Sequence, residues 1–346
     1  MKRKVVLFLI LPLLIIIAFI GDLAWGSIHM SFGDVIDALQ RLSQSGEELS
    51  STDYIVLNFR LPKAITALIA GAGIATAGLC LQSLFQNPLA DTSILGINSG
   101  AGVGVALYTM SHVLFPAHST APAMYNVWAI ALSACIGAFV VLMIILGFVS
   151  YLKDIVSVLI IGVMVGFLAS SIITVLQFFS EEEALRSYLL WSFGSISGTT
   201  WGQLRLVIPV VSFALLLTLT LPKYLNALTL GENYARSVGV NVQKVRVVLI
   251  IITSIITGTI TAFVGPIAFL GLAVPHFCRI IFRTADHKVL IVANMLCGSL
   301  LLLCCDMLTQ MPNGAALPVN AITSMIGAPI VVLGIIKSSK KRSIFK

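Results

Sequence analysis

Residues 127–149 read VWAIALSACIGAFVVLMIILGFV, and no Asp, Glu, Lys or Arg interrupts this run. A helix needs about 20 mainly apolar residues to cross the hydrocarbon core of a bilayer, so the run is long enough to span one. Of the 346 residues, 58% are hydrophobic and only 10% are charged, whereas soluble domains carry about 25% charged residues. This composition argues against a soluble enzyme, a disordered scaffold or a nucleic-acid-binding module, and it predicts a protein embedded in lipid.

Similar apolar runs recur along the chain and predict ten transmembrane helices in all. We place them at residues 5–25, 61–83, 93–111, 127–149, 155–178, 203–221, 244–264, 267–282, 289–308 and 318–336. The segments between them are too short for a soluble domain, so residues 1–346 are predicted to form one transmembrane domain. The first run resembles a signal peptide, but its continuation to Trp25 and the later spans favour a retained helix. The predicted fold class is an all-α, polytopic membrane protein.

The positive charges predict the orientation of the spans, because Lys and Arg concentrate in cytoplasmic loops. An even number of spans puts both termini on one side of the membrane. Only five of the 21 Lys and Arg residues then fall on the other side: Arg41, Arg60, Lys63, Arg186 and Arg205. Both termini are therefore predicted to be cytoplasmic, and the net charge of +7 reflects topology rather than nucleic-acid binding.

The most polar segment on the predicted cytoplasmic side is residues 222–243, where we expect two short helices. Thr229 and Glu232 have the spacing of a capping box, in which two side chains satisfy backbone amides at a helix start. Gly239 is suited to ending that helix in a left-handed conformation. Asn241 is suited to capping the helix that leads into the seventh span.

The predicted span 155–178 combines small and polar residues. Gly162, Gly166 and Ser170 recur at four-residue spacing, and Thr174 continues the series. Such spacing lets helix backbones approach closely, which makes plain packing the simplest explanation. Because polar side chains lie on the same helix, we also predict that these four residues line a transport pathway.

Acidic residues are scarce in the middle of the predicted spans, and Asp306 lies close to the outer end of the ninth. Carriers driven by protons or sodium ions usually need ionisable groups inside the membrane. The chain also contains neither the G-x-x-x-x-G-K-[ST] pattern of a P-loop nor the H-E-x-x-H and G-x-S-x-G patterns of catalytic sites. We therefore expect no catalytic residue, metal site or cofactor, and an energy supply from a partner protein.

Seven segments, in order, resemble the FecCD-type permease subunits of ATP-binding-cassette (ABC) importers for ferric siderophores, haem and cobalamin. They are residues 60–63 (RLPK), 78–91 (GLCLQSLFQNPLAD), 95–101 (LGINSGA), 191–195 (WSFGS), 230–232 (LGE) with Gly239 and Val240, 269–276 (FLGLAVPH) with Arg279, and 317–329 (LPVNAITSMIGAP). The resemblance covers about residues 54–336. It implies a homodimer in a bacterial cytoplasmic membrane, with the pathway on the two-fold axis. Two ATPase subunits would bind inside and use the ATP, an external solute-binding protein would dock outside, and no nucleic acid would take part.

The resemblance also implies roles for residues at the outer mouth. Arg60 and Lys63 match a basic pair that meets carboxylates of the binding protein. Exposed charges of this kind steer encounter and fix register, although snorkelling at a helix end is the simpler explanation. Gln310 stands where family members often carry a third basic residue, so a third basic contact is less expected here.

Further roles are implied on the cytoplasmic side. Asn87 and Leu89 match a region of the inner gate, which residues 151–156 would face. The elements that seat in the ATPase groove are matched by Gly231, Glu232, Arg236 and Gly239.

The solute is expected to be an iron–siderophore complex or haem, with a cobalamin importer as the alternative. An alternative from another class is a secondary transporter that works without an ATPase. The scarcity of acids inside the spans argues against it. An intramembrane enzyme is disfavoured because no catalytic constellation is evident.

Overall fold

The protein is described here by a computed structural model that covers residues 2–26, 30–41, 50–110, 126–152, 154–310 and 317–343. Helices account for the regular structure of these residues. The longer helices are α1 (Lys2–Ala24), α4 (Leu61–Leu84), α5 (Ile97–Thr109), α7 (Val127–Tyr151), α8 (Ile155–Phe178), α10 (Trp201–Thr218), α13 (Val242–Val264), α14 (Leu270–Phe282), α15 (His287–Thr309) and α16 (Val319–Ser343). The shorter ones are α2 (Phe32–Arg41), α3 (Ser51–Ile55), η1 (Val56–Arg60), η2 (Thr92–Leu95), α9 (Glu182–Ser192), α11 (Pro222–Thr229) and α12 (Glu232–Ser237).

Each of the ten predicted spans coincides with one of the longer helices. Among the described residues, seven helices are long and apolar enough to cross a membrane. Two others, α5 and α14, have only 13 residues, so each is about 20 Å long and shorter than the hydrocarbon core. Both follow a break in the backbone, at Gly96 (φ 72°) before α5 and at Phe269 (φ 64°) before α14. Position 111, the predicted end of the third span, lies outside the described residues.

The second predicted span starts earlier than expected. Residues Ser51–Leu84 form one continuous helix built from α3, η1 and α4. Its start is a capping box, because Ser50 accepts from the backbone amide of Asp53 and Asp53 accepts from that of Ser50. Arg60 and Lys63 therefore lie within a long helix and not at its first residues.

Helix α4 lies at the centre of the bundle and contacts α1, α10, α13, α14 and α15. Small residues make these approaches possible, since lipid supplies no hydrophobic force that would press helices together. A Cβ atom at Gly71 would strike the backbone of Gly298 in α15, and one at Gly78 would strike the backbone of Gly271 in α14. The small residues of α4 thus serve close packing of the helices.

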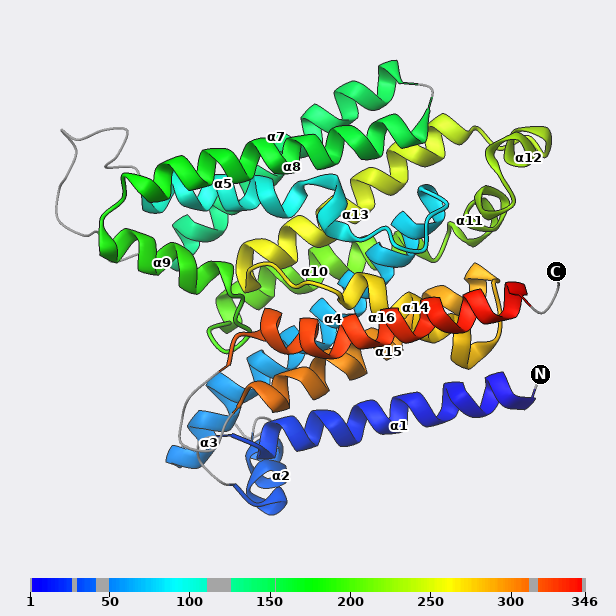
Figure 1. The fold of residues 1–346 in the computed structure, drawn as a ribbon. Coiled ribbons are helices and arrows are strands. Elements are labelled where there is room, and N and C mark those ends of the chain that lie inside the picture. The colour runs from blue at the N-terminus through cyan, green and yellow to red at the C-terminus, as the bar shows by residue number, and fades with distance from the viewer. Residues whose placement is uncertain are drawn as a thin grey trace.

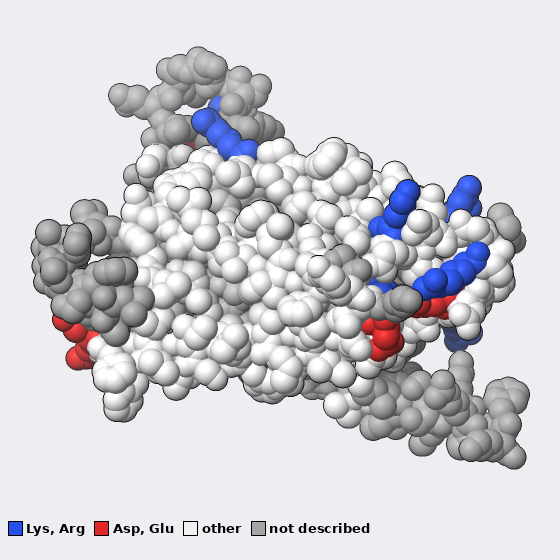
Figure 2. Space-filling view, turned by 90° about the horizontal axis from the view of Figure 1, so that it is seen from above, with Lys and Arg blue, Asp and Glu red and all other residues white. Residues whose placement is uncertain are grey.

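The bundle has two distinct ends. In Figure 1, both termini lie at the same end as α11 and α12, whereas α2, α3 and α9 lie at the opposite end. We call these the α12 end and the α3 end. Figure 2 shows Lys, Arg, Asp and Glu toward the two ends of the visible face, with a broad uncharged band between them. This distribution fits a helix bundle whose middle is surrounded by lipid.

The two short helices predicted in 222–243 are α11 and α12, but the predicted capping box is wrong. Helix α12 begins after Gly231, and the Thr229 hydroxyl donates to the carbonyl of Asn226 instead. Gly239 has φ 84°, as expected for a left-handed stop. Asn241 accepts from the backbone amide of Lys244 at 3.0 Å and caps α13, so that prediction is confirmed.

Candidate functional site

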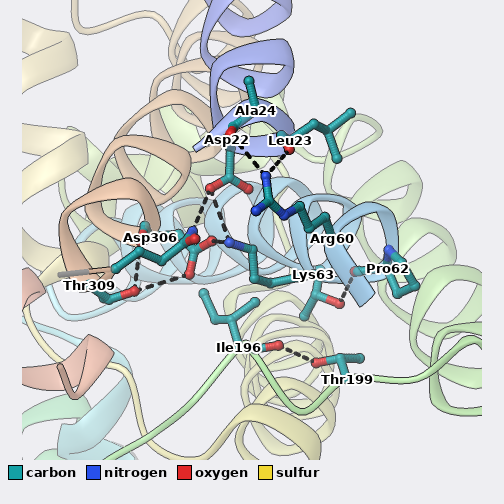
Figure 3. Close-up of polar contacts among 12 residues, drawn as sticks. Asp22, Leu23, Ala24, Arg60, Pro62, Lys63, Ile196, Thr199, Asp306 and Thr309 are labelled. Carbon is teal, nitrogen blue, oxygen red and sulfur yellow. Dashed lines mark hydrogen bonds and ion pairs between the residues drawn. The ribbon is translucent and has the colours of Figure 1, made fainter. Parts of the chain in front are cut away.

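A buried charge cluster lies near the α3 end, between α1, α4 and α15. The Lys63 Nζ atom lies 2.8 Å from Oδ2 of Asp306 and 3.3 Å from Oδ1 of Asp22. The side chains of both aspartates are fully buried, and that of Lys63 is 7% exposed. Figure 3 shows the three side chains converging from different helices. Burying charges costs free energy unless they are paired, so the positive charge of Lys63 compensates the buried carboxylates.

Arg60 and Gln310 belong to the same cluster. Arg60 donates to the carbonyls of Leu23 (2.7 Å) and Ala24 (2.9 Å) at the end of α1. Gln310 donates to Oδ1 of Asp22 at 3.3 Å. The structure therefore brings the three predicted docking residues together.

The expectation that this basic pair is exposed is wrong. Arg60 is 7% exposed and Lys63 is 5% exposed, because they lie within the long helix and turn toward α1 and α15. Their positive charges already have partners in this chain. A docking role for Arg60, Lys63 and Gln310 stays a prediction.

The buried acids lie near the ends of the spans. Asp22 and Asp306 are fully buried, close to the last residues of α1 and α15, and Asp91 is 7% exposed in the segment between α4 and η2. No Asp or Glu lies in the middle of a long helix among the described residues, in agreement with the predicted scarcity of acids there.

The predicted gate residues lie in a tight turn at the α12 end. Asn87 follows α4, its backbone amide donates to the carbonyl of Gln82 at 3.1 Å, and its side chain accepts from the amide of Leu89 at 3.0 Å. Leu89 is 47% exposed. Gln86 adopts φ 48°, a backbone conformation that residues other than glycine rarely adopt, and it turns the chain sharply after α4.

A hollow of about 430 Å³ separates this turn from its neighbours. Its lining combines Phe85 and Gln86 with residues 154–156 and 230–234. Residues 154–156 thus lie across the hollow from the start of this turn, and their part in a gate stays a prediction. Asp154 caps α8 here, and hydrogen bonds from the backbone amides of Ser157 and Val156 lower the pKa of its carboxyl group.

The predicted coupling residues form and anchor α12. Gly231 adopts φ 111° before the helix, a conformation that favours glycine. Glu232 lies 2.6 Å from Nη2 of Arg246 in α13 and 3.6 Å from Arg236 one turn later in α12. The side chain of Arg246 is 1% exposed and also donates to the carbonyl of Leu152 at 3.4 Å. Glu232 therefore ties α12 to α13 and to the end of α7.

The outer side of α12 is exposed and partly apolar. Leu230, Tyr234 and Val238 are 66%, 47% and 54% exposed. Leu230 precedes the helix, Tyr234 lies within it and Val238 follows it, so exposed apolar side chains occur all along this short segment. The side chain of Arg236 is 60% exposed in the same helix. A group of exposed apolar residues is typical of a surface that binds a partner.

Helix α8 separates the four predicted pathway residues into two groups. Gly162 is buried and packs against the carbonyl of Ile94, and Gly166 packs near Ser99, so both serve contacts with η2 and α5. For Gly162 the packing alternative is therefore correct within this chain. Ser170 and Thr174 are exposed on the outside of the bundle.

Three residues that organise these sites were not predicted from the sequence. Asp22, Arg246 and His287 are all buried. Each has a partner that is distant in sequence, and Arg246 also contacts Glu232 and Gln243, which are closer to it in the chain. A charged residue inside an apolar run was the available signal for Asp22, because such a residue needs a partner. No signal in the sequence identified the partner itself.

The chain is similar to known transport proteins over nearly its whole length. Residues 13–337 match the FecCD transport family. The vitamin B12 import system permease protein BtuC of Salmonella typhi is 31% identical over 341 residues, covering 98% of this chain and 97% of that protein. BtuC of Salmonella typhimurium has the same identity and coverage. A solved chain, described as an inward-facing conformation of a proposed metal-chelate type ABC transporter, has a TM-score of 0.79 at 28% identity and covers 94% of this chain and 97% of its own.

Proposed function

This chain belongs to the FecCD transport family, and we propose that it carries an iron–siderophore complex or haem through the membrane. It is the permease subunit of an ABC importer and not an enzyme. A partner ATPase supplies the energy, and an external binding protein supplies the solute. The whole chain acts as one permease domain, with its α12 end in the cytoplasm of a bacterial cell.

The observation that carries the energy-coupling part of the proposal is the exposed face of α12. Leu230, Tyr234 and Val238, in and beside this helix, offer exposed apolar side chains to a groove on the ATPase, and Arg236 offers a charge. On the other side, Glu232 fixes the helix to the buried Arg246. A helix held in this way transmits the closure of the ATPase subunits to the spans as a rigid-body movement.

Asn87 and Leu89 act as the inner gate in this proposal. They lie in the turn after α4. This turn begins beside the hollow that is lined by residues of α12 and by residues 154–156. A displacement of α12 therefore changes the space beside the gate, which is the geometric requirement for coupling.

Two copies of the chain form the pathway between them. Helix α8 exposes Ser170 and Thr174 on the outside of the bundle, where lipid offers hydroxyl groups no partner. The Thr174 hydroxyl bonds back to the carbonyl of Ser170 at 2.9 Å. An exposed polar strip on an otherwise apolar helix supports a pathway at the interface of a homodimer.

The external binding protein docks at the α3 end. If Lys63 and Gln310 take part, carboxylates of that protein compete with Asp22 for both side chains, and with Asp306 for Lys63. For Arg60 they compete with the carbonyls of Leu23 and Ala24. Docking then exchanges buried ion pairs instead of adding contacts to an exposed basic patch.

Cobalamin is the second candidate solute. The observation that favours it is the 31% identity to vitamin B12 permeases over 98% of this chain. The wide family resemblance does not separate a corrin from an iron chelate, because each is a large metal complex.

The proposed function is tested with the complete complex in lipid vesicles. The permease, its ATPase and its binding protein are reconstituted, and uptake of haem, a ferric siderophore and cobalamin is measured with and without ATP. We expect concentrative uptake of one of them only with ATP and the ATPase present. Accumulation driven by an ion gradient without the ATPase would contradict the proposal, and uptake of cobalamin alone would select the second candidate.

A further inference from the structure

Three side chains fix the α12 end of α4 to three other elements. Gln82 accepts from Arg279 of α14 at 2.6 Å. Ser83, one residue later, meets His287 of α15 at 2.7 Å. Gln86, in the turn that follows α4, donates to the carbonyl of Leu228 in α11 at 3.0 Å. The gate turn at 85–91 begins at this point. The position of the gate therefore depends on how α4 is held here.

His287 is the centre of the longest of these connections and is only 1% exposed. One ring nitrogen, Nε2, lies 2.7 Å from the Ser83 hydroxyl, and the other, Nδ1, lies 2.7 Å from Oδ1 of Asn226 in α11. The backbone amide of His287 donates to the same oxygen at 2.9 Å. A buried chain of hydrogen bonds thus runs from α11 through α15 to α4.

The neighbours of Asn226 define the direction of this chain. Its amide nitrogen donates to Asp286 at 2.8 Å, so its oxygen is the atom that faces His287. An amide oxygen only accepts, which assigns the ring hydrogen to Nδ1 and makes Nε2 an acceptor. The Ser83 hydroxyl, which also lies 2.9 Å from the carbonyl of Leu79, directs its hydrogen to Nε2 in this arrangement. Every polar atom of the connection has a partner, as a buried network requires.

We propose that Asn226, His287 and Ser83 form a bridge through which movement of α11 and α12 displaces the end of α4 and the gate turn behind it. The inference rests on the proposed function, because it assumes that an ATPase moves α12. His287 is a positioning residue in this bridge, since it acts through Ser83 and touches no solute. The contact between Gln86 and Leu228 runs parallel to the bridge and supports the same movement.

The test follows the gate directly, so it does not depend on knowing the solute. Spin labels are placed at Leu89→Cys and Val156→Cys, which are 47% and 56% exposed at the α12 end, in a chain whose six native cysteines are replaced. The distance between the labels is measured in the complete complex without nucleotide and with ATP. ATP hydrolysis is measured on the same samples.

We expect Ser83→Ala and Asn226→Ala each to reduce the fraction of complexes that change this distance by roughly threefold or more, with ATP hydrolysis maintained. Ser299→Ala is the matched control. It also removes a buried serine bond between α15 and α4, to the carbonyl of Leu68 at 2.7 Å, but it leaves α11 untouched. Ser83→Thr keeps the hydroxyl and should restore the movement.

The outcomes separate the two claims. A wild-type complex with no ATP-dependent distance change would contradict the proposed function, and the bridge with it. A wild-type complex that responds, together with Ser83→Ala and Asn226→Ala variants that respond equally, would overturn the bridge alone. An equal loss in Ser299→Ala would also overturn it, because any weakened contact between α15 and α4 would then suffice.

Discussion

At the scale of single residues, Lys63 faces two buried carboxylates at once. Lys63→Met keeps the length of the side chain and removes its charge, which leaves Asp22 and Asp306 uncompensated in a buried site. Breaking a buried ion pair typically costs about 3–5 kcal/mol. We expect the detergent-solubilised chain to lose stability by this amount, measured as thermal or denaturant unfolding.

Arg41 provides the matched control for Lys63. It pairs with Asp53 at 2.7 Å, but its side chain is 42% exposed. Arg41→Met should cost at most about 1 kcal/mol, since exposed pairs contribute little. Equal losses in the two variants would show that the cluster around Lys63 is not buried in the folded protein.

The residues at these sites were predictable to different degrees. Arg60, Lys63 and Glu232 were found because their sequence context resembles a family. Their surroundings were not, since the partners Asp22 and Arg246 depend on helix packing that no local pattern encodes. The predicted exposure of Lys63 was wrong for the same reason. A lysine near the end of a predicted span is exposed or buried according to which helix packs beside it.

At the scale of elements, the exposed side of α12 is predicted to bind the ATPase, and this prediction can be tested directly. Tyr234→Asp places a charge between the exposed apolar residues Leu230 and Val238. An aromatic residue at the centre of an interface often contributes about 2 kcal/mol or more, so we expect roughly thirtyfold weaker association. The measurement is the affinity of the purified permease for its ATPase. Tyr54→Asp is the control, because Tyr54 is similarly exposed near the α3 end. Equal weakening by both would refute α12 as the contact.

The start of α15 makes a prediction about pH. A hydrogen bond from Asn226, followed by one from the backbone amide of Lys288, lowers the pKa of Asp286 below its ordinary value of 3.8. A carboxyl group whose pKa is lowered by folding stabilises the protein above its unfolded pKa, and this contribution disappears as pH falls through the folded value. The unfolding temperature of the wild type should exceed that of Asp286→Asn at pH 6. The difference should shrink below about pH 4. A difference that is constant with pH would exclude ionised Asp286 as its source.

Element boundaries show where sequence patterns were sufficient. Apolar runs located all ten long helices, and the Asn241 cap was correct because capping is a local interaction. The Thr229 pattern failed because Gly231 adopts a left-handed φ and starts the helix without a side-chain cap. The start at Ser51 was missed although Ser50 and Asp53 carry the spacing of a capping box. In that case the apolar run begins several residues after the helix start, so hydropathy alone placed the start too late.

At the scale of the whole molecule, the two ends of the bundle are held by different interactions. The α3 end joins α1, α4 and α15 through buried charges, whereas the α12 end exposes a short helix and fixes the turn after α4 by hydrogen bonds. In the proposed homodimer, the transport pathway lies between the two copies, which agrees with the position of α4 in the centre of the single bundle.

Helix α8 allows a direct test of where that pathway lies. Ser170 and Leu168 are both exposed, but a separation of two residues places them on flanks of the helix about 160° apart. In a cysteine-free chain, Ser170→Cys should react with a membrane-impermeant thiol reagent at least about tenfold faster than Leu168→Cys, because in the proposed homodimer only the axis offers water and thiolates react in water. The rates are measured in membranes by mass shift. The rate at Ser170→Cys should also change when the ATPase binds ATP, since the pathway opens and closes. Equal, slow reaction at both positions would place Ser170 in lipid and remove α8 from the pathway.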